Sequence, residues 1–128
     1  MDETKAKVPL KAISLKRLAR IYSARGNHKE AIKRLTEALK YDAEDNEPLR
    51  LRGIEFQRLQ NYKQALADFS EAIETAPDTT ANYELRASLY DKLGETNLAK
   101  KDRREGQRLH DVPAEKPVYD LKGADPKD

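Results

Sequence analysis

The chain has 128 residues, of which 38% are hydrophobic and 38% are charged, and its formal net charge is +2. It contains no cysteine, which excludes disulfides, thiolate metal sites and a cysteine nucleophile. No apolar run approaches the roughly 18 residues that a membrane-spanning helix needs, and residues 1–11 lack the apolar stretch of a signal peptide. We therefore expect no membrane association and a cytoplasmic location.

The spacing of apolar residues predicts six helices and no strand. In chain order, the helices are expected at residues 10–25, 28–41, 47–59, 62–75, 80–93 and 96–110. Asn27 with Glu30 places a capping residue and a reciprocal partner three positions apart at the start of the second helix. Asn61 with Gln64 repeats that arrangement at the start of the fourth helix.

A period of 34 residues runs through these helices. It is marked by three alanines, Ala31, Ala65 and Ala99. An aromatic residue precedes each alanine by nine positions and a small residue precedes each by twelve; these are Tyr22, Phe56 and Tyr90, and Ala19, Gly53 and Ala87. A fixed period of this length indicates stacked supersecondary units rather than one globule.

The repeated residues resemble the tetratricopeptide repeat family. The middle unit, residues 46–79, matches its characteristic positions with Leu49, Gly53, Phe56, Ala65, Phe69, Ala72 and Pro77. The resemblance implies an all-α fold, a right-handed solenoid of three antiparallel helix hairpins, and a scaffold or adaptor role in protein binding. The expected repeats are 12–45, 46–79 and 80–111, in a domain of residues 10–111 between an N-terminal arm (1–9) and a flexible C-terminal tail (112–128).

The second and third units share a pair of opposite charges. Arg52 and Arg86 stand where the family usually has leucine, and each is followed sixteen residues later by an aspartate, Asp68 or Asp102. These positions can face one another across a helix hairpin, which suggests partly buried ion pairs. The alternative is that they are unrelated surface charges.

The resemblance also implies a binding groove, because members of the family generally bind extended peptides on the concave face lined by the first helix of each hairpin. The candidate peptide-binding residues are Lys16, Arg17, Arg20, Arg50, Leu51, Ile54, Gln57, Arg58, Glu84, Ser88 and Asp91. From Thr4 to Lys29 there is no acidic residue, which favours an anionic partner near the first repeat. The alternative is an ordinary solvated helix that happens to be basic.

The favoured function is a monomeric interaction module that binds a protein or peptide segment, acidic and with apolar anchors. Two alternatives stay open: binding of nucleic acid or another polyanion through the basic first helix, which we expect to be the less favoured, and self-association of repeat arrays. We expect no enzyme, catalytic residue, metal or cofactor. His28 and His110 are expected far apart, and no glycine-rich phosphate loop is present.

One well-known function of the family is to grip the acidic C-terminal peptide of heat-shock chaperones with a two-carboxylate clamp of Lys, Asn, Asn, Lys and Arg. In this sequence only Lys16 fits its clamp position. The other four positions hold Arg20, Leu51, Ala81 and Leu85. Leucine and alanine side chains cannot donate hydrogen bonds to a carboxylate. The sequence therefore predicts a partner other than these chaperone peptides.

Overall fold

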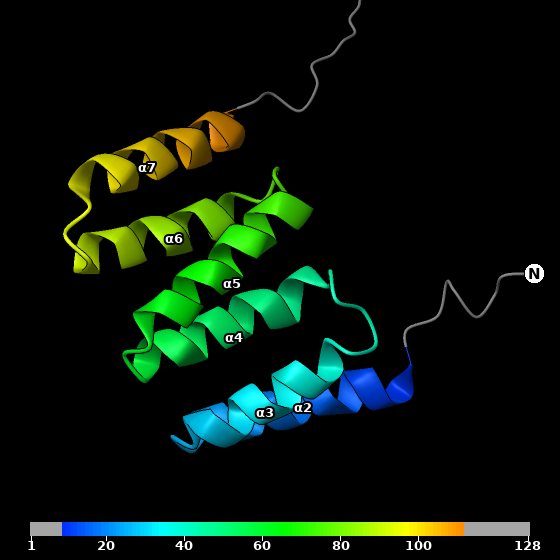
Figure 1. The fold of residues 1–128 in the computed structure, drawn as a ribbon. Coiled ribbons are helices and arrows are strands. Elements are labelled where there is room, and N and C mark those ends of the chain that lie inside the picture. Colours follow the sequence, from blue (N-terminus) through cyan, green and yellow to red (C-terminus); the bar gives the residue numbers. More distant parts are fainter. Residues whose placement is uncertain (1–8, 112–128) are drawn as a thin grey trace, which may run out of the picture.

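The structure, a computed structural model, describes residues 9–111. In that part of the chain it confirms an all-helical fold with six helices and no strand (Figure 1). They are α2 (Leu10–Ala24), α3 (His28–Ala38), α4 (Asn46–Arg58), α5 (Tyr62–Thr75), α6 (Thr80–Lys92) and α7 (Thr96–Asp111). Each boundary lies within three residues of its predicted place. The predicted tail and most of the predicted arm lie outside the described residues.

The helices form three hairpins that stack in chain order. Within each hairpin α2 packs on α3, α4 on α5 and α6 on α7, and the hairpins join through α3 with α4 and α5 with α6 (Figure 1). Each helix therefore contacts mainly its neighbours in sequence, as expected for a solenoid. The first helix of each hairpin lies on one side of the stack and the second on the other.

Small residues allow the two helices of each hairpin to approach closely. The repeated alanines Ala31, Ala65 and Ala99 are fully buried. At Gly53, an added Cβ would lie only 2.5 Å from the Phe69 ring, so the aromatic side chain of α5 occupies the space that a larger residue on α4 would need. The close approach of α4 and α5 therefore explains why this repeat position holds a small residue.

The turns within the hairpins require a left-handed backbone at one position. Gly26 and Gly94 adopt it with φ values of 79° and 78°, where glycine has no steric penalty. The middle hairpin uses Gln60 at the corresponding place, with φ of 62°.

The two predicted capping pairs have different outcomes. The Asn27 side chain accepts the Glu30 backbone N–H at 3.3 Å, as predicted, but the expected reciprocal bond is replaced, because the Asn27 backbone N–H donates to the Tyr22 carbonyl. Asn61 makes no side-chain capping bond to the backbone; its amide instead donates to the Gln64 side chain, so this capping prediction is wrong. The Asn61 and Gln64 side chains bond to each other, and the Asn61 oxygen does not cap the helix.

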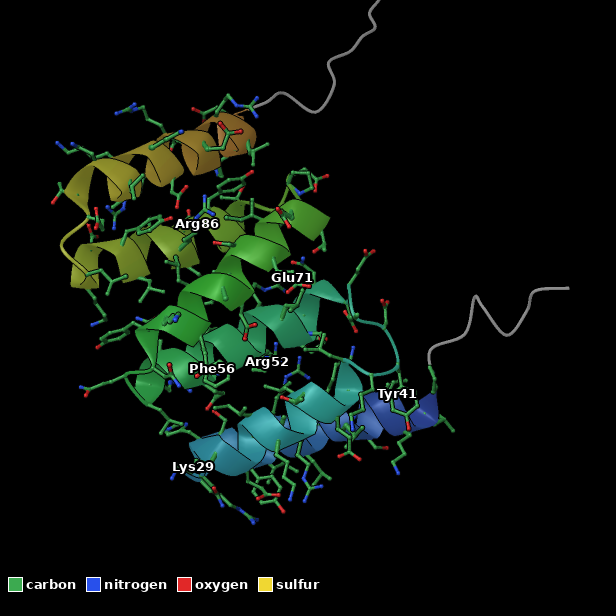
Figure 2. The ribbon with its side chains drawn as sticks, viewed as in Figure 1. Lys29, Tyr41, Arg52, Phe56, Glu71 and Arg86 are labelled. Carbon is green, nitrogen blue, oxygen red and sulfur yellow. The ribbon has the colours of Figure 1, made fainter. Side chains whose placement is uncertain are left out.

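The predicted arginine–aspartate pairs are confirmed. Arg52 donates from Nε and Nη2 to the two carboxylate oxygens of Asp68, both at 2.9 Å. Arg86 makes the same two bonds to Asp102 at 2.8 and 2.9 Å, one repeat further along the stack (Figure 2). Both aspartates are buried, so each carboxylate is held by a planar, two-pronged donor.

Each of these arginines also links two repeats. The third donor, Nη1, reaches a hydroxyl on the helix that precedes it in the stack: Arg52 bonds Thr36 on α3 at 3.1 Å, and Arg86 bonds Ser70 on α5 at 3.2 Å. One guanidinium therefore holds its own hairpin together and fixes that hairpin against the previous one.

Candidate functional site

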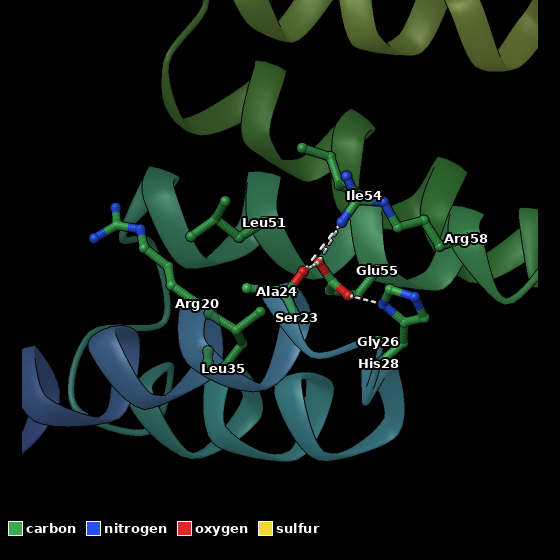
Figure 3. A pocket seen from close by; sticks show the side chains of 11 residues that line it. Arg20, Ser23, Ala24, Gly26, His28, Leu35, Leu51, Ile54, Glu55 and Arg58 are labelled. Atoms are coloured by element: carbon green, nitrogen blue, oxygen red, sulfur yellow. Dashed lines mark hydrogen bonds and ion pairs between the residues drawn. The ribbon is translucent and has the colours of Figure 1, made fainter.

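A hollow of about 600 Å³ lies between the first helices of repeats one and two, α2 and α4. Leu35, Leu51 and Ile54 supply apolar walls, and Arg20 and Arg58 bring positive charge to it (Figure 3). This combination can hold an apolar side chain of a bound segment while the guanidinium groups attract carboxylates beside it.

A buried carboxylate lies at one side of this hollow. Glu55 on α4 accepts a hydrogen bond from Ser23 Oγ on α2 at 2.7 Å, and its other oxygen lies 2.6 Å from His28 Nδ1 at the start of α3. Arg58 donates to both Glu55 and Ser23 (Figure 3). A buried carboxylate is costly unless it is paired, so Glu55 needs these partners. Since the partners come from α2, α3 and α4, the network ties three helices together at the first repeat junction.

A second hollow of about 590 Å³ follows at the next junction, between α4 and α6. Ile54 and Arg58 line both hollows, so the two form one continuous groove along the first helices of the hairpins. Leu85 and Tyr62 add apolar surface to the second hollow, and Lys92 adds a positive charge.

Six of the eleven predicted binding residues line the two hollows. Arg20, Leu51, Ile54 and Arg58 line the first, and Ile54, Gln57, Arg58 and Ser88 line the second. The structure therefore brings these six residues, which come from α2, α4 and α6, together on one side of the stack.

The other five predicted residues do not line these hollows. Arg50 donates to Asn46 and Asn82, so it joins α4 to α6. Asp91 pairs with Arg103 of α7, which lowers the pKa of Asp91 below its ordinary value. Glu84 lies beside Gly106 on α7, and Arg17 is exposed on α2 away from the hollows.

The fifth residue, Lys16, is engaged within the protein. Its ammonium lies 3.1 Å from Asp45 and 3.3 Å from Glu47, and Arg20 also pairs with Glu47. Burial alone lowers the pKa of Lys16, but the hydrogen bonds and attraction of the two carboxylates outweigh it, so the pKa is raised. Two cations of the basic first helix are therefore compensated by acids at the start of α4.

Among the groove residues outside the predicted set are the three that form the buried network with Arg58: Ser23, His28 and Glu55. One signal for Glu55 was present in the sequence. The corresponding positions in the other repeats hold Ile21 and Leu89, so a carboxylate stands in an apolar register. Ser23 and His28 carry no such signal, because their partner is distant in sequence.

Within residues 9–111, no group of three or more His, Cys, Asp or Glu side chains could hold a metal ion. None of the helices described there is long and apolar enough to cross a membrane.

Comparison with known proteins gives a family match and many similar folds. Residues 14–47 match the model of the tetratricopeptide repeat family. Among curated proteins, none matches this chain in sequence.

Similar solved structures include two domains of Spaghetti (RPAP3). Its second TPR, bound to the HSP90 peptide SRMEEVD, has a TM-score of 0.72 and 24% identity over 77% of this chain and 92% of that one. Its first TPR, bound to the same peptide, gives 0.74 and 26% over 78% and 79%. The TPR2B domain of yeast Sti1 in complex with pHsp70 gives 0.76 and 23% over 79% and 81%. These likenesses confirm the all-α helical-repeat fold.

The comparisons also correct one prediction. We expected a partner other than the two-carboxylate-clamp type of chaperone peptide, and this exclusion is wrong, because the similar structures are TPR domains in complex with HSP90 and Hsp70 peptides. The exclusion considered five register positions only. The groove also carries polar side chains at other positions: Ser23, His28 and Arg58 hold Glu55, and the Arg58 side chain stays 52% exposed beside the first hollow.

Proposed function

From the premise that this chain carries a tetratricopeptide repeat at residues 14–47 and stacks three helix hairpins in that fold, we propose that its concave groove binds an extended acidic segment of another protein. The module acts by holding a partner and not by catalysis. The observation that supports this is the first hollow, where the apolar Leu51 and Ile54 lie beside Arg20 and Arg58. Each guanidinium pairs with one internal carboxylate, Glu47 or Glu55, but more than half of each arginine side chain stays exposed to a partner.

The form of the groove sets the chemistry of the partner. Two hollows at successive junctions share Ile54 and Arg58, so a bound chain can place one apolar side chain in each and a carboxylate near the shared arginine. We take the spacing of packed helices, about 8–10 Å, as the order of magnitude of the separation between the two hollows. An extended chain advances about 3.3 Å per residue, so the two apolar side chains should be about three residues apart.

The peptide SRMEEVD, to which two of the similar domains are bound, is the first probe to use. It has three acidic residues and two apolar ones, Met and Val, separated by two glutamates. Affinity can be measured by isothermal titration against SRMEEVD and against SRMQQVD, which has two fewer charges. We expect the acidic peptide to bind more tightly at low salt, with the difference shrinking as salt screens the groove.

Three variants locate the binding. Arg58→Gln should weaken binding mainly at low salt, and Ile54→Ser should weaken it at all salt concentrations, because it removes apolar contact area. Arg17→Gln is the matched control, since Arg17 is an exposed arginine that lies outside both hollows. Equal affinity for the two peptides, or equal losses in Arg17→Gln and Arg58→Gln, would contradict the proposal.

Failure of SRMEEVD to bind calls for a wider test. A displayed library of random peptides should then yield sequences rich in Asp and Glu with apolar residues about three apart. Enrichment of basic or uncharged sequences would also contradict an acid-binding groove.

A further inference from the structure

At the N-terminal end of the stack, α2 has a face that takes no part in the concave groove, and we call it the leading face. It consists of Lys11, Ser14, Leu18, Ile21 and Arg25. These residues recur at intervals of three and four, so they lie along one side of the helix. The apolar pair is at the centre, and a cation stands at each end.

The internal repeat shows what this face does in the other two hairpins. The residues 34 positions after Leu18 and Ile21 are Arg52 and Glu55 of α4, and both bond to α3: Arg52 to Thr36, and Glu55 to His28. The corresponding residues of α6 are Arg86, which bonds Ser70 on α5, and Leu89, which packs with Ala65 and Phe69 of α5. In both cases the face receives the second helix of the preceding hairpin.

On α2 the same face is uncovered within the described part of the chain. Leu18 and Ile21 keep 39% and 47% of their surface exposed, whereas Glu55 and Leu89 are buried. A hollow of about 320 Å³ opens beside Leu18, lined also by Lys11, Ser14, Leu15, Arg34 and Glu37. This face therefore keeps an exposed apolar centre at the place where the preceding helix covers α4 and α6.

The positive charges on the leading face indicate which kind of partner can bind there. No acidic residue stands between Thr4 and Lys29, so the two cations on the leading face have no acidic neighbour on their own helix. Lys16 and Arg20 point elsewhere, toward Asp45 and Glu47. An occupant that places carboxylates opposite Lys11 and Arg25 gains electrostatic attraction at both ends of the contact.

A second copy of this chain is a poor match for the leading face, although α7 carries Glu105, which pairs with Arg108, and the exposed Asp111. Head-to-tail stacking would put α7 against the leading face, but α7 presents Arg104 where Thr36 and Ser70 stand in the earlier repeats, with Lys100 and Lys101 exposed nearby. Two leading faces packed together would oppose cation to cation. Like charges in direct contact disfavour both arrangements.

We propose that the leading face of α2 docks an amphipathic helix of a partner protein. That helix carries apolar side chains at its centre and carboxylates near both ends. It lies on α2 as α3 lies on α4 and as α5 lies on α6. This site is separate from the concave groove, and it recognises a folded helix where the groove recognises an extended segment.

The chain itself supplies a model for the probe. A synthetic, end-blocked peptide with the sequence of residues 61–76 corresponds to α5, which covers the equivalent face of α6. The substitution Lys63→Glu in this peptide places a carboxylate near its beginning as well as its end. A second peptide, with Phe69→Ser as well, serves as the peptide control because it lacks the apolar centre.

Binding can be mapped by ¹H–¹⁵N NMR titration of the full chain. We expect shifts concentrated between Lys11 and Arg25, weaker binding at high salt, and roughly tenfold or greater loss of affinity in a Leu18→Glu/Ile21→Glu variant. Leu98→Glu is the matched protein control, because Leu98 on α7 is 42% exposed, similar to Leu18. Thermal melting by circular dichroism checks that both variants fold.

Three results would overturn the proposal. The first is the absence of shifts at millimolar peptide. The second is shifts centred on groove residues such as Leu51 and Ile54, or on α7. The third is an equal loss of affinity in Leu98→Glu or equal binding of the Phe69→Ser peptide, either of which indicates non-specific apolar adhesion.

Discussion

Replacing Gly53 by alanine tests whether the middle hairpin is held by a close contact. A Cβ at this position would lie 2.5 Å from Cε1 and 2.8 Å from Cδ1 of Phe69, about 0.9 Å inside the 3.4 Å at which ordinary contact begins. Phe69 is fully buried and cannot swing into solvent. The added methyl group must therefore displace the ring or separate α4 from α5.

Two effects of opposite sign decide the magnitude. Alanine raises helix propensity by about 1 kcal/mol over glycine. Overpacking of a tight core costs about 1–3 kcal/mol. Since the overlap is large and the ring is enclosed, we expect the clash to win, with a net loss of about 1 kcal/mol in the free energy of unfolding.

The first repeat provides a natural comparison. It has Ala19 and Leu35 where the second has Gly53 and Phe69, and both Ala19 and Leu35 are buried. The double variant Gly53→Ala/Phe69→Leu rebuilds that pair in the second repeat. Phe69→Leu alone should cost about 1–1.5 kcal/mol. The double variant should be more stable than the sum of the single losses predicts, by about 1 kcal/mol or more.

Urea unfolding followed by circular dichroism measures all three variants. Gly106→Ala is the control, because a Cβ there would meet its nearest atom, Thr80 Cγ2, at 3.6 Å, which is ordinary contact. That variant should gain up to about 1 kcal/mol from helix propensity. If Gly53→Ala gains stability as Gly106→Ala does, or if the double variant is simply additive, the close contact does not constrain the hairpin.

Three further predictions follow from single contacts, each measured by urea unfolding. Arg52→Met should cost about 2–3 kcal/mol, because it leaves the buried Asp68 carboxylate unpaired, and adding Asp68→Leu should recover part of this loss; equal stability of the single and double variants would contradict the pair. Gln60→Gly should gain about 0.5–1 kcal/mol by removing a side chain from a left-handed position, and a loss would contradict this. Glu55→Leu installs the residue that the third repeat has at Leu89, and it should change the free energy of unfolding by less than about 1.5 kcal/mol. It should also remove the part of the salt dependence of unfolding that comes from the Arg58–Glu55 pair. A larger loss of stability would show that the network is essential.

The sequence alone determined the architecture. The 34-residue period predicts helix hairpins because each unit must bury one apolar stripe, and the repeated small and aromatic residues locate that stripe. The Arg52–Asp68 and Arg86–Asp102 pairs were also readable, because the same pair of substitutions appears twice at the same spacing. A pattern that recurs in register reports a local contact within one hairpin, which is short-range and therefore predictable.

The groove was predicted in part. Arg20, Leu51, Ile54 and Arg58 come from the exposed side of successive helices, which helical periodicity alone can locate. Periodicity placed Arg50 and Asp91 in the groove, but their side chains bond within the protein. The side of a helix that faces the groove and the side that faces a neighbouring helix differ by only a small rotation about the helix axis.

Only the tertiary structure shows which charged side chains of the groove region are compensated by ion pairs within the protein. Lys16 and Arg20 were predicted as free cations, but they meet Asp45 and Glu47, which lie 27 to 31 residues away and on another hairpin. Glu55 likewise gathers Ser23 and His28 from two other helices. These contacts occur once and do not follow the period. They depend on how one hairpin is placed on the next, and that placement is set by the whole packed interface rather than by any local run of residues.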